Sequence, residues 1–174
     1  QPGAVAAIAT GLGADVPSQL APGPLLGTGA GETLAAAPAL EPYGVVIVPQ
    51  PFPLPTADVY READRIGVGR SAEELAAVRA RLRTGFTRAH VVNDLQAAAL
   101  SLAPEIGDAI EAALGAGADD AIVCGSGPTV IGLFWGADGA PRAREAADRL
   151  HAAHPEAVAA DPFRGGDRGA TANE

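Results

Sequence analysis

Short apolar runs bounded by turn residues mark the expected strands of the chain. Residues 45–48 form a continuous β-branched run between a glycine and a proline, which predicts a strand buried on both faces. Two more runs, 121–124 and 130–135, flank the glycine-containing turn 125–129 and predict a β-hairpin. A last apolar run at 157–160 predicts a final strand.

Apolar residues at helical spacing predict helices between these strands. We expect Thr56 to cap the first helix, because a threonine hydroxyl can accept a hydrogen bond from a backbone amide at the start of a helix. Ser71 and Glu74 have the spacing of a capping box and predict the start of the second helix. The remaining helices are expected at 93–104, 106–114 and 141–151.

The helices are expected to turn their apolar residues toward the core. These residues are Leu75, Val78, Leu82, Leu95, Ala99, Leu102, Ile106, Ile110, Leu114, Ala143, Ala147 and Leu150. We expect Asn93 and Asp94 to cap the helix that follows them. Strand, helices, hairpin, helix and strand in this order predict an α+β fold, with helices on one face of a mainly antiparallel sheet.

The first forty-one residues follow a different pattern and predict a separate part of the chain. Residues 5–8 could end a helix, and leucines on either side of the turn 27–32 predict a hairpin or two short strands. An alanine- and proline-rich connection follows, and we place a domain boundary at its end. We therefore divide the chain into 1–41, 42–163 and a tail, 164–174, which lacks apolar periodicity and is expected to be disordered.

Composition and charge narrow the class of protein. Hydrophobic residues make up 48% and charged residues 19% of the 174 positions, which predicts a folded chain. The formal net charge of −9, without a basic stripe, argues against a nucleic-acid surface. The first residues have neither the charged start of a signal peptide nor an apolar run long enough to span a membrane. We expect a cytoplasmic protein with no nucleic-acid or membrane partner.

Several enzyme motifs are missing from the sequence. It contains no Walker phosphate loop, and its GTGAGE turn lacks the third glycine of the dinucleotide fingerprint. The segment around Ser126 is not a nucleophile elbow, because Cys124 and Pro128 replace the outer glycines. Cys124 is the single cysteine, and its apolar strand predicts a buried, small hydrophobic residue. The three histidines lie on unrelated segments, so no metal site is expected.

Asp15 is the first candidate for chemistry, and the residues alone leave three roles open for it. It lies between small residues and a Val-Pro step, where it could cap a helix, orient a loop or point a carboxylate at a substrate. Two glycine turns, 27–31 and 125–127, could line an anion site, because glycine lets backbone amides approach closely. Such turns are more often only turns.

Five motifs in order give the chain a family resemblance. They are LGADVP at 12–17, GTGAGETL at 27–34, PTADVY at 55–60, NDL at 93–95 and GSGPTVIGLF at 125–134. In this order and spacing the chain resembles the carboxy-terminal half of a GHMP small-molecule kinase, up to about Phe163. The resemblance implies a ferredoxin-like carboxy-terminal domain, preceded by the tail end of an amino-terminal domain like ribosomal protein S5.

The resemblance also implies an activity and roles for individual residues. The members most similar in these motifs transfer the γ-phosphoryl group of ATP, with Mg²⁺, to an alcohol group of a cytidine-diphosphate-linked polyol in non-mevalonate isoprenoid biosynthesis. Asp15 would be the base or orienting carboxylate for that hydroxyl. Thr56 and Tyr60 would lie near the cytidine, with Tyr60 either stacked on the base or packed at the interdomain seam. The turn residues Gly125, Ser126 and Gly127 would support the phosphate loop.

The chain departs from the family pattern at several places. Ser18 and Gln19 replace the usual apolar residues, and Ala30 stands where arginine is frequent. The family's catalytic lysine and main ATP-binding loop have no counterpart in the sequence. We therefore expect a piece of a kinase that needs the amino-terminal half as a partner and is inactive alone. Two alternatives are a stand-alone small-molecule-binding module and a GHMP kinase with a different acceptor alcohol.

Overall fold

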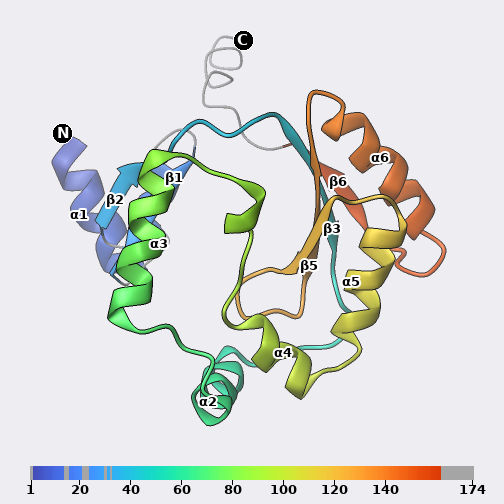
Figure 1. Ribbon diagram of the computed structural model, residues 1–174, viewed down its shortest axis with the longest axis horizontal. Helices are drawn as coiled ribbons and strands as arrows, with labels where there is room; N and C mark the ends of the chain where they lie inside the picture. Colours follow the sequence, from blue (N-terminus) through green and yellow to red (C-terminus); the bar gives the residue numbers. More distant parts are fainter. Residues whose placement is uncertain (1, 14–15, 21–23, 30, 32, 162–174) are drawn as a thin grey trace. The chain divides into compact units, whose positions relative to one another are not determined.

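The computed structural model describes the chain except for residues 1, 14–15, 21–23, 30, 32 and 162–174 (Figure 1). The chain forms two compact units. The first contains most of Gln1–Leu40 together with Arg81–Phe86, and the second contains Glu41–Ala80 and Thr87–Pro162. The described helices include none that is both long enough and apolar enough to cross a membrane.

A four-stranded antiparallel sheet forms the centre of the second unit. Its strands are β3 (Tyr43–Val48), β4 (Asp120–Val123), β5 (Val130–Trp135) and β6 (Val158–Ala160). Their order across the sheet is β4-β5-β3-β6, and each neighbouring pair is antiparallel. Strands β4 and β5 form a hairpin, helices connect β3 to β4 and β5 to β6, and β3 lies between β5 and β6. This is the strand order of a ferredoxin-like sheet. The predicted α+β fold is confirmed.

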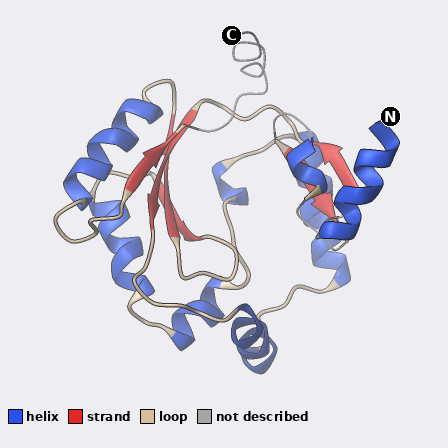
Figure 2. Ribbon diagram, turned by 180° about the vertical axis from the view of Figure 1, so that it is seen from behind, coloured by secondary structure: helices blue, strands red, loops and turns tan. Residues whose placement is uncertain are grey.

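Helices connect these strands in the predicted order. They are α2 (Thr56–Ile66), α3 (Ala72–Thr84), the short 3₁₀-helix η2 (Arg88–His90), α4 (Gln96–Leu102), α5 (Ile106–Gly115) and α6 (Gly139–Leu150). Both α5 and α6 pack on the same face of the sheet, and α2 packs against α4 (Figures 1 and 2). The predicted capping box at the start of α3 is confirmed, because Ser71 N donates to Glu74 Oε2 and Glu74 N donates to Ser71 Oγ.

The central strand β3 is buried on one face only. Gly44, Val46 and Val48 are buried, whereas the residues between them are half-buried. The expectation of a strand buried on both faces was therefore wrong. Its continuous β-branched run concealed an alternation that arises because only one face of the sheet carries α5 and α6.

Alanine and glycine, rather than leucine, fill most of the contact between helices and sheet. Ala109 and Ala113 of α5 and Ala143 and Ala146 of α6 are buried, while Leu114 is 45% exposed. Similarly, Leu75 and Leu102 are each 42% exposed, so the expected burial of these three leucines was wrong. On α5 the small side chains let the helix approach the sheet closely, and this rotates the buried stripe away from Leu114. Leu75 lies on α3, which has no buried residue, and the buried residues of α4 are Ala98 and Ala99.

Two glycines show how close this approach is. A Cβ atom on Gly44 would lie 2.3 Å from the carbonyl oxygen of Gly139, at the start of α6. A Cβ atom on Gly139 would lie 2.7 Å from Gly44 N. Because backbone meets backbone here, neither position has room for a side chain.

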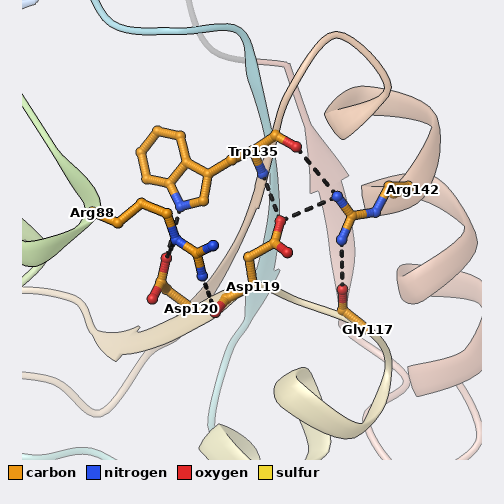
Figure 3. A network of polar contacts seen from close by, with 6 residues as sticks. All are labelled: Arg88, Gly117, Asp119, Asp120, Trp135 and Arg142. Carbon is orange, nitrogen blue, oxygen red and sulfur yellow. Dashed lines mark hydrogen bonds and ion pairs between the residues drawn. The ribbon is translucent and has the colours of Figure 1, made fainter.

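A polar network ties together one end of the sheet (Figure 3). Asp120 Oδ2 accepts hydrogen bonds from Arg88 Nε at 2.9 Å and Trp135 Nε1 at 2.7 Å. Asp119 Oδ2 accepts from Trp135 N at 2.8 Å and forms an ion pair with Arg142 at 3.1 Å. Burial raises the pKa of Asp119, but the hydrogen bonds from Arg142 and Trp135, together with the positive charges of Arg142 and Arg88, outweigh this effect, and the pKa is lowered overall. This end of the sheet is opposite the turn between β4 and β5.

The first unit contains short elements. They are α1 (Pro2–Leu12), the 3₁₀-helix η1 (Pro17–Leu20), β1 (Leu25–Thr28) and β2 (Thr33–Ala36). Strands β1 and β2 pair antiparallel, with Leu25 opposite Ala36, so the predicted hairpin is confirmed. Gly29 and Gly31 have φ angles of 73° and 103°, which explains why glycine is needed in the turn.

Candidate functional site

A glycine turn, residues 124–129, joins β4 to β5 and contains three of the predicted site residues. Cys124 N donates to Thr129 O at 2.8 Å, and Gly127 N donates to Cys124 O at 2.9 Å. Gly125 and Gly127 have φ angles of 58° and 83°, in the left-handed region that favours glycine. A Cβ atom on Gly127 would lie 3.1 Å from a methyl group of Val123. Gly127 is therefore required both by its backbone angle and by its surroundings.

The free thiol of Cys124 is exposed at the start of this turn. The expectation that Cys124 is a buried strand residue was wrong. Strand β4 ends at Val123, and the chain turns away from the sheet one residue later.

Thr56 and Ser126 contact each other across the second unit. Their hydroxyl oxygens are 3.0 Å apart, although 70 positions separate them in the sequence. Thr56 is the first residue of α2, and Pro55 occupies the cap position without a side-chain cap bond. Thr56 therefore does not cap its helix as expected, because its hydroxyl is bonded to the glycine turn. The structure brings together two of the predicted site residues.

Tyr60 lies one helical turn after Thr56. Its side chain is 56% exposed, whereas the preceding residue, Val59, is fully buried in the core. Burial of Val59 fixes the rotation of α2, so Tyr60 is held on the outer surface of the helix. An exposed aromatic ring at this position has room to stack on a planar ligand.

Asn93 holds the glycine turn through hydrogen bonds from a separate segment of the chain. The sequence did not indicate this role. Its Nδ2 donates to Val123 O at 2.8 Å and to Gly125 O at 2.7 Å. Its Oδ1 accepts from Leu95 N at 2.9 Å, just before α4 begins. Asn93 was expected to cap α4, and it does bond to the backbone just before the helix. The residue at the cap position itself, however, is Leu95.

The neighbours of Asn93 also make contacts at long range. Gln96 Oε1 accepts from Val123 N at 3.0 Å. Asp94 forms an ion pair with Arg70 at 2.8 Å rather than capping α4. No spacing rule links position 93 or 96 to the end of β4, so only the order of the family motifs could have suggested that these segments meet.

Glu62 connects α2 to α4 through hydrogen bonds. Arg65 donates two hydrogen bonds to its carboxylate, at 2.6 and 2.7 Å, and Ser101 of α4 donates a third. The hydrogen bonds from Arg65 and Ser101 lower the pKa of Glu62 to about 2. The carboxylate is therefore charged at neutral pH and holds the helix that carries Thr56 and Tyr60.

Asp15 lies outside the described residues, so the structure gives no geometry for it. It belongs to the first unit, whereas Thr56, Tyr60 and the glycine turn belong to the second. The candidate site is therefore described from the second unit alone.

The model of the family described as "GHMP kinases C terminal" matches residues 67–153, which is half of the chain. The chain belongs to the GHMP kinase family. The match begins just after α2 and runs through the glycine turn to the end of α6. It thus includes Asn93 and the turn that Asn93 holds.

Individual GHMP kinases are similar to a larger part of the chain. The 4-diphosphocytidyl-2-C-methyl-D-erythritol kinase of Moorella thermoacetica is 38% identical over 90% of this chain and 56% of its own length. The enzyme of the same name from Nocardioides sp. strain JS614 is 39% identical over 89% of this chain and 53% of its own length. The chain spans about half the length of the curated relatives that it matches.

Solved structures give the same family. A crystal structure of 4-(cytidine 5'-diphospho)-2C-methyl-D-erythritol kinase matches 89% of this chain and 55% of its own, with a TM-score of 0.67 and 30% identity. Homoserine kinase from Cytophaga hutchinsonii matches 76% of this chain and 45% of its own, with a TM-score of 0.53 and 17% identity. The second likeness shows the shared GHMP fold alone.

GHMP kinases use ATP, whose triphosphate and metal ion need free backbone amides and clustered carboxylates. In the glycine turn, the amides of Cys124 and Gly127 are bonded within the turn itself, and the hydroxyl of Ser126 faces Thr56. No group of three or more His, Cys, Asp or Glu side chains in the described part of the chain could hold a metal ion. These three groups are therefore not available to a triphosphate, and the described residues offer no cluster of ligands for a magnesium ion.

Proposed function

We propose that the chain is the carboxy-terminal part of a kinase that phosphorylates a hydroxyl of 4-diphosphocytidyl-2-C-methyl-D-erythritol. In this reaction the hydroxyl oxygen forms a bond to the γ-phosphorus of ATP, the bond to ADP breaks, and the hydroxyl proton passes to a base. Relatives of this name are 38% and 39% identical to about nine tenths of the chain. The product would serve the non-mevalonate route to isoprenoid precursors, and we expect the enzyme in the cytoplasm.

The contact between Thr56 and Ser126 is the observation that supports this proposal most directly. It joins the start of α2, which carries Tyr60, to the glycine turn, which the family resemblance links to the phosphate loop. In the proposed enzyme Tyr60 stacks on the cytosine ring, and Thr56 lies beside the nucleotide. The turn residues Gly125, Ser126 and Gly127 are proposed to support the site rather than to be primary ligands of the triphosphate, because the Gly125 carbonyl, the Ser126 hydroxyl and the Gly127 amide are engaged within the protein.

Asp15 is proposed as the base or orienting carboxylate for the accepting hydroxyl. A carboxylate that accepts the hydroxyl proton is a common component of phosphoryl-transfer sites. The proposal for Asp15 rests on its position in the GADVP motif, residues 13–17. Removal of this carboxylate should abolish turnover while leaving substrate binding nearly unchanged, because its role lies in the transfer step.

The rest of the active site is proposed to come from the part of the relatives that this chain does not span. Residues 1–41 would complete the family's amino-terminal domain, residues 42–163 would form the carboxy-terminal domain, and 164–174 would be a tail. The partner would supply the lysine, the main ATP-binding loop and the Mg²⁺ site. We therefore expect no ATP turnover from this chain alone.

A hybrid enzyme tests the proposal. The portion of the Moorella thermoacetica kinase that this chain does not span is joined to the chain, and transfer from ATP is followed by ³¹P NMR. We expect the phosphorylated cytidine-diphosphate product from the hybrid and none from the chain alone. Homoserine as the acceptor is the control substrate. Transfer to homoserine but not to the cytidine substrate, or turnover by the chain alone, would contradict the assignment.

A further inference from the structure

The side chain of Asn93 uses all of its local hydrogen-bonding capacity at the candidate site. Both protons of its amide nitrogen have acceptors, Val123 O at 2.8 Å and Gly125 O at 2.7 Å. Its oxygen accepts from Leu95 N at 2.9 Å. An asparagine amide offers two donors and an acceptor on one planar group, which is what this position requires. An aspartate of the same shape has the acceptor but lacks the donors.

The two carbonyl groups that Asn93 holds lie on either side of Cys124. Val123 ends β4, an edge strand of the sheet, and Gly125 begins the left-handed part of the turn. The turn has its own internal bonds at Cys124 and Gly127, but these do not fix the direction of the Gly125 carbonyl. Asn93 fixes this direction, and Ser126, the next residue, then meets Thr56 at 3.0 Å.

We propose that Asn93 is a positioning residue that sets the Ser126–Thr56 contact and, through it, the position of the first turn of α2, next to Tyr60. This inference rests on the proposed function only for the identity of the ligand that Tyr60 receives. Asn93 touches no ligand in this scheme. It acts through the carbonyl of Gly125, the hydroxyl of Ser126 and the first turn of α2.

Gln96 provides a matched control for this role. It lies on the same segment and contacts the same strand end, but its oxygen accepts from Val123 N, so only an acceptor is needed. Gln96→Glu keeps this acceptor, whereas Asn93→Asp removes both donors and brings a carboxylate close to two carbonyl oxygens. Both variants add one negative charge next to the same turn. A difference between them therefore reports the contacts with the two carbonyl groups, and not a negative charge added near the turn.

The experiment is hydrogen exchange and NMR on the chain at neutral pH. In Asn93→Asp we expect the amides of Gly127 and Cys124 to exchange about tenfold faster, as loss of hydrogen bonds of ordinary strength implies. The amide signals of Thr56 and Ser126 and the ring signals of Tyr60 should shift. Tyr43 and Trp135, which contact each other at the opposite end of the sheet, should not shift. Gln96→Glu should leave all of these signals unchanged.

A second variant covers the case in which Asn93→Asp does not fold. Asn93→Ser keeps a short acceptor for Leu95 N but cannot reach both carbonyls, and it should give the same local changes with a melting temperature lowered by only a few degrees. Turn amides that exchange at the unaltered rate in a folded Asn93 variant would overturn the proposal. So would faster exchange without any shift at Thr56 or Tyr60, because Asn93 would then only brace the turn.

Nucleotide binding separates this inference from the proposed function. Calorimetric titration of the chain with the cytidine-diphosphate substrate should show weaker binding for Asn93→Asp than for Gln96→Glu. Absence of binding by the unaltered chain would count against the proposed cytidine site. The exchange and NMR results would still decide the role of Asn93, because they require no ligand.

Discussion

The hydroxyl oxygens of Thr56 and Ser126 lie 3.0 Å apart and connect the start of α2 to the turn between β4 and β5. The bond is at the surface, and a neutral hydrogen bond of this kind contributes about 0.5–1.5 kcal/mol to stability. Its importance therefore lies in geometry. It holds the helix of Tyr60 and the glycine turn in a single arrangement.

Replacement of both hydroxyls tests this coupling. Thr56→Val and Ser126→Ala should each weaken binding of the cytidine substrate in the hybrid kinase, and the double variant should be no worse than the poorer single variant. Steady-state KM values for that substrate provide the measurement. The melting temperature should change little, because the bond is exposed. Effects on KM that simply multiply would mean that the two residues act independently.

Gly127 should not tolerate a side chain. Its φ of 83° and the 3.1 Å approach of Val123 predict that Gly127→Ala lowers the free energy of unfolding by about 1–3 kcal/mol. The matched control is Gly125→Asn, because position 125 opens into free space and asparagine accepts a left-handed backbone. Urea denaturation of the two variants measures the difference. Equal stability of both variants would refute the assigned crowding.

Gly44 should also not tolerate a side chain. A Cβ at this position would lie 2.3 Å from Gly139 O, so Gly44→Ala must separate α6 from β3. We expect a loss of about 3 kcal/mol or more, as for other overpacked interiors. Gly69→Ala is the control, because position 69 has open surroundings and should be neutral or slightly stabilising. Thermal melts of both variants check this, and a Gly44→Ala variant as stable as the control would contradict it.

Glu62 should make the fold sensitive to acid. Hydrogen bonds from Arg65 and Ser101 lower its pKa to about 2 in the folded chain, against an ordinary value of 4.5. Between these values the unfolded state binds the proton and the folded state does not, so acid favours unfolding. The stabilisation is complete above pH 4.5 and is lost as the pH falls toward 2.

Glu62→Gln provides the measurement of this effect. Its melting temperature should fall less steeply between pH 4.5 and 2 than that of the unaltered chain. Ser101→Ala, which removes one of the hydrogen bonds to the carboxylate, should give an intermediate slope. Parallel pH profiles for all three proteins would show that Glu62 is not the responsible group.

The sequence predicted the elements of the fold better than the contacts between them. The run 45–48 and the Ser71–Glu74 box are local signals, and local backbone preferences decide where strands and helices begin. Which side chains become buried depends on packing across the sheet. Leu114 was expected in the core, yet the close fit of alanines leaves it 45% exposed.

For the candidate site, too, the sequence predicted residues better than the contacts between them. The family resemblance named Thr56 and Ser126, and the structure places them in contact. Local rules assigned the Thr56 hydroxyl to its own helix, because they contain no information on a partner 70 positions away. Asn93 was missed as a clamp for the same reason: its partners Val123 and Gly125 lie on another strand and turn.

The central claim is that Tyr60 receives the cytosine of a nucleotide-linked substrate. In the hybrid kinase, Tyr60→Ala should raise the KM for 4-diphosphocytidyl-2-C-methyl-D-erythritol by about 5- to 100-fold, the range expected for loss of a base stack. The KM for ATP should not change, and Tyr60→Phe should restore the original values. Unaltered KM for the cytidine substrate in Tyr60→Ala, or an equal rise in both KM values, would contradict the account.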